Sequence, residues 1–316
     1  MLASVIVPTK GRPEKLARAL ASLQRQDDPD WEAVVVDDGA GEGIEVVERL
    51  GDPRVRGVPS AGTGQVDARS TGIQQARGEL VCWLDDDDWW DDPRHVSLLR
   101  ESPRDRFSFR GGWIVFADGR RDPFDHQATC ESLRVNNTVL TSSIAYPRVL
   151  HDRLGPLDRS LGGYCDWDFM LRMCGAGLGP HRLPGRGVCY EIHDENVSAE
   201  YDAPERRRGF ERFARKHGLR IKIANHLSIH RELVSVPEGW SEVDNALERE
   251  FRFDDFVQAI AFVNRVAELA ESENHHPDIA VSYSCVTLRW STHSAGGITD
   301  RDRDLAVRST ELAADS

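Results

Sequence analysis

The sequence predicts an α/β protein with two domains. Over roughly the first 220 residues, short β-branched runs alternate with amphipathic helix patterns, which is typical of crossover units around a mainly parallel sheet. Most of the formal net charge of −13 falls in the last 86 residues, which hold 17 acidic and 8 basic residues. We therefore expect a first domain over 1–222, a connector over 223–236 and a smaller acidic domain over 237–316.

The elements of the first domain follow one another in a regular order. Ala3–Val7 is a β-branched run that ends at Pro8, and Pro13 begins a helix pattern whose leucines and alanines share one face. Further strands are predicted over 31–36, 54–58 and 79–84, and a helix over 65–77 follows the turn SAGTG. In such sheets, ligands gather at the carboxyl ends of the strands.

Acidic clusters follow two of these strands directly. VVVDDG places Asp37 and Asp38 after one strand, and CWLDDDDWW places Asp85–Asp88 after another. Two unit charges about 4 Å apart repel by about 4 kcal/mol at the effective dielectric of a protein surface, so the second cluster is either a solvated loop or a cation site. Because carboxylates suit Mg²⁺ or Mn²⁺, and both clusters fall at one sheet edge, we expect a divalent metal and a nucleotide diphosphate there.

Composition argues against several other classes of protein. No apolar run approaches the ~18 residues of a membrane span, and the N-terminus lacks the features of a secretory signal, so we expect a cytoplasmic protein with no integral membrane segment. The six cysteines form no CxxC pair, which argues against a disulfide framework or zinc knuckle. The acidic second domain makes nucleic acid an unsuitable partner.

Four stretches of the first 220 residues carry a family resemblance: SVIVPTKGR, VVVDDG, ARSTGIQQARGELVCWLDDDDWW and LDRSLGGYCDWDFMLRM. Together and in this order they resemble the family 2 inverting glycosyltransferases, which have the Rossmann-like, nucleotide-sugar-binding GT-A fold. The resemblance implies metal-dependent transfer of a sugar from a nucleotide-diphosphate donor to a hydroxyl or amine, with Mn²⁺ or Mg²⁺ as the cofactor. A UDP-sugar is favoured, although guanine is not excluded.

The resemblance also implies roles for individual residues. It assigns binding of the metal to Asp87 and His193. It assigns binding of the nucleotide sugar to Pro8, Thr9, Asp37, Asp38, Arg69, Asp85 and Asp86. Asp85 and Asp87 match the aspartate-x-aspartate element, so one contacts the ribose and the other the metal, with Asp88 in support. Asp166 is the expected base that removes the acceptor proton.

Alternatives remain for several of these residues. Arg69 alone reads as a surface arginine on a helix, and His193 alone as a structural histidine. Asp166 or Asp168 is also explained as an acidic residue favoured at a helix N-terminus. The chain departs from the family pattern at Cys165, where relatives often carry glutamate, and after Arg69, where they commonly carry asparagine.

The tail has its own pattern of elements. A helix pattern over 256–270 runs into Glu271, and His275 follows on the same face if the helix continues. The runs 281–283 and 286–290 read as a hairpin, and a last helix begins near Thr299. Three histidines and a glutamate suggest zinc, but His275 and His276 are neighbours, and neighbours in an extended chain point to opposite sides.

The motifs of this tail are GW at 239–240, FRFDDFVQAIAFVNRVAELAE, HHPDI and THSAGGITDRD. They resemble the pterin-4a-carbinolamine dehydratases, whose fold is a four-stranded antiparallel sheet with helices on one face. The resemblance implies metal-free dehydration of a 4a-hydroxytetrahydropterin, and association of the chain into a homo-oligomer through this domain. It assigns acid/base roles to His275, His276 and His293, and the pterin pocket to Trp240, Glu271 and Asp302.

Two other interpretations of the tail stay open. In the first, the chain is a single-function glycosyltransferase whose tail mediates only oligomerisation or acceptor recognition. In the second, a pterin is itself the acceptor of the sugar, a hypothesis that rests only on the covalent fusion of the two domains. Binding of a reduced pterin, or its glycosylation, distinguishes these interpretations.

Overall fold

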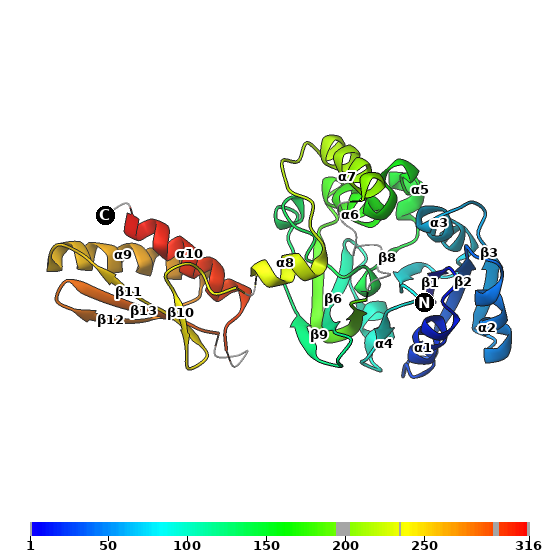
Figure 1. The fold of residues 1–316 in the computed structure, drawn as a ribbon, viewed down its shortest axis with the longest axis horizontal. Helices are drawn as coiled ribbons and strands as arrows, with labels where there is room; N and C mark the ends of the chain where they lie inside the picture. Colours follow the sequence, from blue (N-terminus) through cyan, green and yellow to red (C-terminus); the bar gives the residue numbers. More distant parts are fainter. Residues whose placement is uncertain (1, 194–202, 234, 293–296, 315–316) are drawn as a thin grey trace. The chain divides into compact units, whose positions relative to one another are not determined.

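A computed structural model describes residues 2–193, 203–233, 235–292 and 297–314. The chain divides into two compact units, Met1–Ile229 and His230–Ser316, and each is considered by itself (Figure 1). The division falls inside helix α8 (His226–Leu233), within the segment 223–236 predicted as a connector. In the described part of the chain, every helix is too short or too polar to span a membrane.

The first unit is built on one mixed sheet, which has nine strands among the described residues in the order β3-β2-β1-β4-β8-β6-β9-β5, with β7 beside β6. The strands β3, β2, β1 and β4 are parallel, as is the pair β6 and β9, and the remaining pairs are antiparallel. Parallel ladders hold most of the paired residues, so the mainly parallel sheet predicted from the sequence is confirmed. The strand bounds are β1 (Ala3–Thr9), β2 (Trp31–Asp37), β3 (Val55–Pro59), β4 (Leu80–Trp83), β5 (Trp89–Trp90), β6 (Phe107–Val115), β7 (Arg121–Phe124), β8 (Ala145–Pro147) and β9 (Pro180–Glu191).

Helices cover both faces of the parallel part of the sheet. Figure 1 shows α3 on one face of β1 and β2, and α1 and α2 on the other. Ile6 of β1 packs in the cluster with α3, whereas Val5 and Val7 pack in the cluster with α1 and α2. A strand buried on both faces has no polar side to expose, which explains its continuous apolar run. The helices are α1 (Pro13–Gln24), α2 (Glu42–Leu50), α3 (Gln65–Gln75), α4 (His95–Glu101), α5 (Leu150–Leu154), α6 (Cys165–Gly175) and α7 (Pro204–His217), with 3-10 turns η1 (Ser132–Arg134), η2 (Thr141–Ser143) and η3 (Arg159–Tyr164).

The strand register brings the two acidic clusters together. Thr9 pairs with Asp37 across β1 and β2, and Ile6 pairs with Trp83 across β1 and β4. The chain therefore leaves β1, β2 and β4 at one edge of the sheet, which is the arrangement predicted from the sequence.

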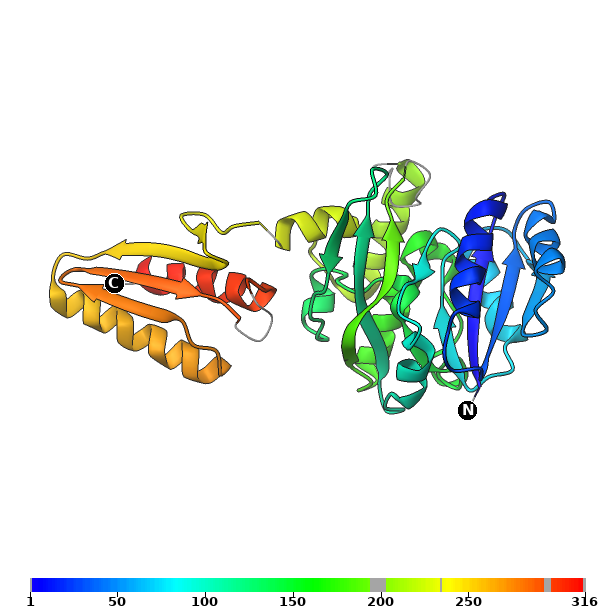
Figure 2. The ribbon, with the colours of Figure 1, turned by 90° about the horizontal axis from the view of Figure 1, so that it is seen from below.

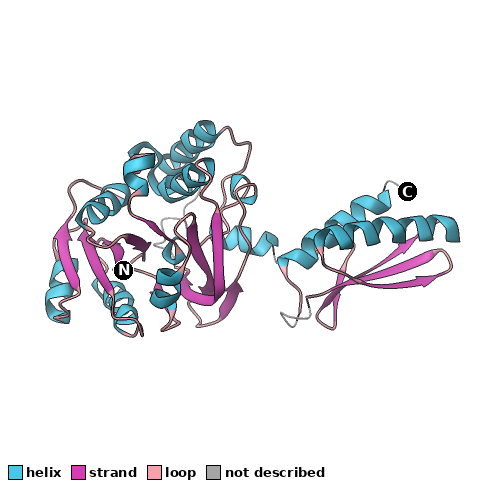
Figure 3. Ribbon diagram, turned by 180° about the vertical axis from the view of Figure 1, so that it is seen from behind, coloured by secondary structure: helices cyan, strands magenta, loops and turns pink. Residues whose placement is uncertain are grey.

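The second unit is a four-stranded antiparallel sheet in the order β10-β11-β13-β12, with two helices on one face (Figures 2 and 3). Val286, Leu288 and Trp290 of β13 point to that face and pack with the apolar side of α9. The predicted hairpin and both predicted helices are confirmed, with somewhat different bounds. The elements are β10 (Ser241–Val243), β11 (Ala246–Arg252), α9 (Phe256–Glu273), β12 (Asp278–Ser282), β13 (Cys285–Trp290) and α10 (Asp300–Ala314).

Candidate active sites

A cavity of about 530 Å³ opens at the edge where β1, β2 and β4 end. It extends from these strand ends to the start of α6 and to the segment between α7 and α8. Nearly all of the residues predicted for the first site line this one cavity: Pro8, Thr9, Asp38, Arg69, Asp85, Asp86, Asp87 and Asp166.

The acidic cluster is neutralised in part by cations of the chain itself. The guanidinium of Arg12 lies 2.7 Å from Oδ1 of Asp86 and 2.7 Å from Oδ2 of Asp87. Thr9 donates its hydroxyl to the other oxygen of Asp86 at 2.7 Å. Arg12 was not among the predicted residues, although it stands three positions after the end of β1 and so at the edge where the aspartates gather.

Burial and mutual repulsion set the protonation of the cluster. Burial, together with the neighbouring carboxylates, raises the pKa of Asp85, and it raises the pKa of Asp86 to about 6. Burial also raises the pKa of Asp88 well above its usual value, and Ser142 donates its hydroxyl to that side chain. The pKa of Asp87 is lowered instead, because its contacts with His193 and Arg12 outweigh the effect of burial. The cluster as a whole disfavours full ionisation in the absence of a further cation.

The residues present fit a divalent metal that shares its ligands with a substrate. Three carboxylates, those of Asp85, Asp86 and Asp87, line one cavity and supply the hard oxygen ligands that Mg²⁺ and Mn²⁺ prefer. Among the described residues, no set of three His, Cys, Asp or Glu side chains is placed to hold a metal by itself.

The two neighbouring aspartates after β2 have different environments. Asp37 accepts hydrogen bonds from the backbone N–H groups of Gly39 and Gly43, at 2.6 and 2.7 Å, and so caps the beginning of α2. Asp38 lies on the cavity and accepts from Lys10 and from the backbone N–H of Gly64. Only Asp38 of this pair lines the cavity. Asp37 instead fixes the turn between β2 and α2 through its two hydrogen bonds.

Arg69 is a buried residue of the site and not the surface arginine considered above. Its side chain is 2% exposed, its Nη2 donates to Oδ1 of Asp85 at 2.6 Å, and its guanidinium lies over the ring of Trp83. Its Nη1 lies 3.8 Å from the sulfur of Cys165, whose pKa burial raises to about 12. A neutral thiol therefore faces Arg69 at the position where relatives often carry glutamate.

The two acidic residues at the start of α6 also have different environments. Asp166 lines the cavity, and its carboxylate accepts from the hydroxyl of Thr141 at 2.6 Å. Asp168 is 0% exposed and accepts from Arg172, Lys216 and His217, which tie α6 to α7. Asp168 is thus a structural ion-pair residue, and Asp166 is the carboxylate open to a ligand.

His193 lies against the acidic cluster, with its Nε2 3.0 Å from Oδ2 of Asp87. The same carboxylate oxygen meets Arg12, so two protein groups share the oxygen that the sequence assigned to a metal. His193 follows β9, which is distant in sequence from the aspartates but pairs with β5 just after them.

Several residues that were not predicted also line the cavity, most of them from the end of the first unit. They are Tyr164, Tyr190, Arg206, Lys222, Asn225, His226 and Ile229. The ring of His226 packs edge-on against Phe124 and Tyr190, and burial lowers the pKa of this histidine. Its Nε2 lies 3.1 Å from the carbonyl oxygen of Val139, which only accepts, so Nε2 carries the proton.

In the second unit, a hydrogen bond with Asp302 fixes the imidazole of His275. Nε2 of His275 lies 2.7 Å from Oδ1 of Asp302, and the imidazole stacks on the ring of Trp290 at 5.6 Å. Asp302 is 0% exposed and also accepts from Thr292 and Thr299. These hydrogen bonds outweigh burial and lower the pKa of Asp302, so the proton of the pair resides on His275 Nε2.

The other residues predicted for the second site lie in different places: two at the surface, one in the core and one outside the described residues. His276 and Glu271 lie at the surface and contact each other at 3.1 Å. Trp240 is buried in the core of the second unit, and its indole N–H donates to Thr310. His293 lies outside the described residues.

Comparison with protein families finds both resemblances. The family model of Glycosyl transferase family 2 matches residues 4–147, and that of Pterin 4 alpha carbinolamine dehydratase matches residues 223–312. The uncharacterized glycosyltransferase YwdF of Bacillus subtilis is 32% identical over 232 residues, which cover 69% of this chain and 85% of YwdF. A protein of Picosynechococcus sp. whose name places it among the pterin-4-alpha-carbinolamine dehydratases is 51% identical over 78 residues, which cover 25% of this chain and 84% of that protein.

Solved structures share the fold of the first unit. The mannosyltransferase PcManGT of Pyrobaculum calidifontis, solved in complex with GDP-Man and Mn²⁺, has a TM-score of 0.54 at 18% identity, covering 70% of this chain and 65% of its own. Residues 1–349 of S. aureus TarS, solved in complex with UDP-GlcNAc, have a TM-score of 0.53 at 20% identity, covering 75% of this chain and 71% of that one. The chain belongs to glycosyl transferase family 2 through its N-terminal unit and to the pterin 4 alpha carbinolamine dehydratase family through its C-terminal unit.

Proposed function

We propose that the N-terminal unit is a metal-dependent, inverting glycosyltransferase that uses a nucleotide-diphosphate sugar and transfers it to a hydroxyl or amine. The observation that carries the proposal is that one cavity holds both the acidic cluster and Asp166. A displacement with inversion needs a group that stabilises the leaving diphosphate and a base on the acceptor side, and these carboxylates supply the two kinds of group.

The donor end of the cavity is the strand edge. Pro8, Thr9 and Asp38 flank the nucleoside, and Arg69 and Asp85 lie beside the ribose and the diphosphate. Asp87 and His193 would hold the divalent metal, Mn²⁺ or Mg²⁺, which would neutralise the charge of the departing diphosphate. We favour a UDP-sugar because Asp38 suits hydrogen bonding to uracil. The nucleotide sugars of the two structural neighbours, UDP-GlcNAc and GDP-Man, support this class of donor in general.

Asp166 is the base in this proposal. Asp166 lies in the first turn of α6, and the hydroxyl of Thr141 fixes one oxygen of its carboxylate. The acceptor oxygen forms its bond to the anomeric carbon as the bond from that carbon to the diphosphate breaks. The acceptor proton passes to Asp166, and the electron pair of the broken bond stays on the diphosphate.

The test is the stereochemistry of donor turnover, which needs no acceptor other than water. The full chain is incubated with Mn²⁺ and UDP-, GDP- or dTDP-sugars of α configuration, and the released sugar is followed by proton NMR. The proposal predicts that one donor is consumed and that the first product is the β anomer. A first product of α configuration would contradict inversion, and equal turnover after EDTA treatment would contradict metal dependence.

For the C-terminal unit we propose dehydration of a 4a-hydroxytetrahydropterin, or at least pterin binding. The specific support is the Asp302–His275 pair, which presents an oriented imidazole for proton transfer. We assign His275, His276 and His293 to acid/base chemistry, with Glu271 beside the pterin. Asp302 and Trp240 act as supporting residues, because both are buried. The expected lyase activity, measured as decay of the 4a-hydroxy adduct, is lost in His275→Ala. If the adduct decays no faster with the wild-type chain than in buffer, the unit serves only in oligomerisation or acceptor recognition.

A further inference from the structure

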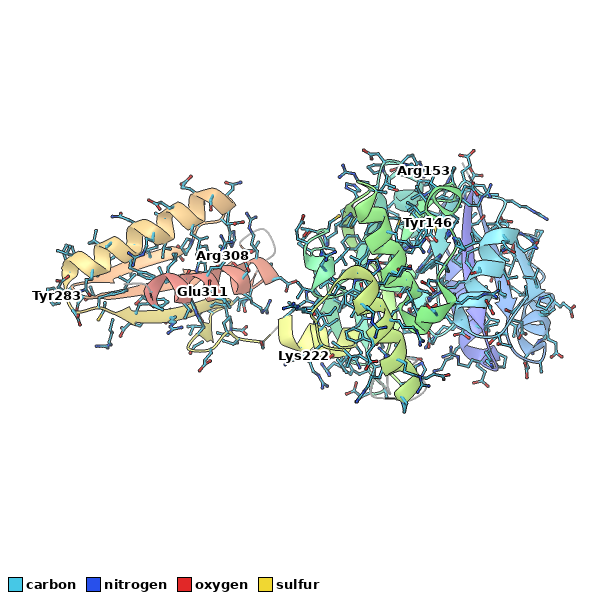
Figure 4. All side chains as sticks on the ribbon, turned by 90° about the horizontal axis from the view of Figure 1, so that it is seen from above. Tyr146, Arg153, Lys222, Tyr283, Arg308 and Glu311 are labelled. Atoms are coloured by element: carbon cyan, nitrogen blue, oxygen red, sulfur yellow. The ribbon has the colours of Figure 1, made fainter. Side chains whose placement is uncertain are left out.

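His226, the first residue of α8, lines the cavity and uses only one of its two ring nitrogens in the fold. Its Nε2 donates a proton to the carbonyl oxygen of Val139 at 3.1 Å. Nδ1 therefore carries a lone pair and no proton, and within the described part of the chain it forms no hydrogen bond. Figure 4 labels Lys222, which lies beside α8 and also lines the cavity.

The surroundings of His226 keep the imidazole neutral and in place. Its ring packs edge-on against Phe124 and Tyr190, whose ring centroids lie 5.6 and 5.5 Å away. Burial lowers the pKa of His226, and the carboxylate of Asp166 opposes that shift. The two side chains are therefore close enough for their charges to interact, and both line the cavity. An unprotonated Nδ1 thus lies near the proposed base.

Asn137 supplies the complementary group. It is 7% exposed, lines the cavity, and accepts the backbone N–H of Val139 on its Oδ1 at 3.2 Å. That hydrogen bond orients the amide, so Nδ2 carries two protons, and it donates to no residue that the structure describes. The N–H and C=O of one buried residue, Val139, thus fix both side chains. One donor and one acceptor are left for a ligand in the cavity.

A donor and an acceptor together match a hydroxyl, which gives one proton and accepts through its oxygen. The hydroxyl that attacks the sugar has a single proton, and in the proposed function that proton passes to Asp166. His226 therefore takes its hydrogen bond from a different group of the acceptor.

We propose that His226 and Asn137 bind a second hydroxyl of the acceptor, so that the acceptor is a polyol with a further hydroxyl close to the one that reacts. This hydroxyl donates to Nδ1 of His226 and accepts from Nδ2 of Asn137. The inference rests on the proposed glycosyltransferase function and specifies the class of its acceptor. Compounds with a single hydroxyl leave the imidazole and the amide unpaired, which disfavours their binding.

The first test follows His226 directly by NMR. The full chain is labelled with ¹⁵N-histidine, and the signals of His226 are identified by their absence in His226→Phe. We expect a neutral ring that is protonated at Nε2. Cyclohexanol is compared with 1,2- and 1,3-cyclohexanediol, which share its ring and add one hydroxyl, in the presence of Mn²⁺ and UDP or GDP. At least one diol should shift the Nδ1 signal at a concentration about tenfold lower than cyclohexanol.

The second test uses transfer. The donor that is consumed with water is offered equal concentrations of a diol and cyclohexanol, and the two glycosides are quantified. The wild type should favour the diol by about tenfold, and His226→Phe and Asn137→Leu should each remove that preference. His126→Phe is the matched control, because His126 packs edge-on against the same ring of Phe124 but does not line the cavity. Circular dichroism verifies the fold of each variant.

The outcomes separate this inference from the proposed function. If a donor is consumed but no diol is preferred, the polyol acceptor is wrong and the glycosyltransferase proposal stands. If His126→Phe removes the preference as fully as His226→Phe, the preference does not arise from His226 and the assignment is wrong. If no donor is consumed, the proposed function fails, whereas a diol that still shifts the Nδ1 signal more readily than cyclohexanol would support the hydroxyl site. Equal shifts by both probes would overturn that site.

Discussion

Arg12 and His193 contact the same carboxylate oxygen of Asp87, at 2.7 and 3.0 Å. One group comes from the loop after β1 and the other from the segment after β9, so Asp87 joins two distant parts of the first unit. The repulsion within the acidic cluster is thereby reduced by the protein itself. A divalent metal would compete with Arg12 for that oxygen.

Replacing Arg12 should make the first unit more dependent on metal. Arg12→Gln leaves Asp86 and Asp87 without their shared cation, and we expect a loss of about 1–3 kcal/mol in the free energy of unfolding for this partly exposed pair. Mn²⁺ should restore part of that loss. The thermal unfolding midpoint, measured with and without Mn²⁺, should therefore shift more in the variant than in the wild type. An equal shift in both proteins would show that Arg12 and the metal do not share a site.

Replacing Asp166 should separate chemistry from binding. Asp166→Asn keeps the shape of the side chain but removes the base, so we expect kcat for sugar transfer to fall by about 10²–10⁴-fold with little change in nucleotide affinity. The matched variant Asp168→Asn disturbs the ion pairs with Arg172, Lys216 and His217 instead, and should lower stability. If Asp166→Asn retained full kcat, another group would have to be the base.

The second unit should lose stability in acid through Asp302. The pKa of this buried carboxylate is lowered in the folded state by hydrogen bonds from His275, Thr292 and Thr299, so its contribution is fully present above the unfolded pKa of about 4. That contribution is lost as the pH falls through the lower folded pKa. Denaturant unfolding followed by tryptophan fluorescence should show the decline below about pH 4, and Asp302→Asn should reduce the acid dependence. A wild type and a variant with parallel pH profiles would refute this role.

Asp302 should also act on catalysis through His275 and not through the pterin. Asp302→Asn is expected to lower kcat for dehydration by about tenfold or more, because the imidazole loses the carboxylate that fixes its orientation and tautomer. KM should change little, because the side chain of Asp302 is 0% exposed. A variant with raised KM and unchanged kcat would instead place Asp302 in the pterin pocket.

Local patterns predicted the parts of the fold in which neighbouring segments pair. The strands at the N-terminus, the meeting of their carboxyl ends and the hairpin of the second unit could all be read from periodicity. The helix α2 was missed because its nine residues are few and its beginning is capped by Asp37, which was interpreted as a ligand. The later strands of the first sheet pair with segments far away in sequence, and periodicity carries no information on such partners.

The residues of the candidate site divide in the same way, into those that a local motif predicts and those that distant segments contribute. Motifs pointed to the aspartates after β4 and to Asp166 of α6, which line the cavity. They did not point to Arg206, Lys222 and His226, because these residues reach the cavity only through packing of α7 and α8. Arg12 could have been found, since its position after β1 places it at the predicted ligand edge. The roles of all these residues in donor and acceptor binding remain predictions for the experiments above.

The central claim is that the acidic cluster binds a nucleotide diphosphate through a divalent metal. Calorimetric titration of the full chain with UDP, GDP and dTDP, each with and without Mn²⁺, tests it most directly, with Asp87→Ala as the variant. The account predicts that one nucleotide, with UDP favoured, binds only in the presence of Mn²⁺ and that Asp87→Ala abolishes this binding. Binding of equal affinity with Mn²⁺ and with EDTA, or in wild type and variant alike, would contradict it.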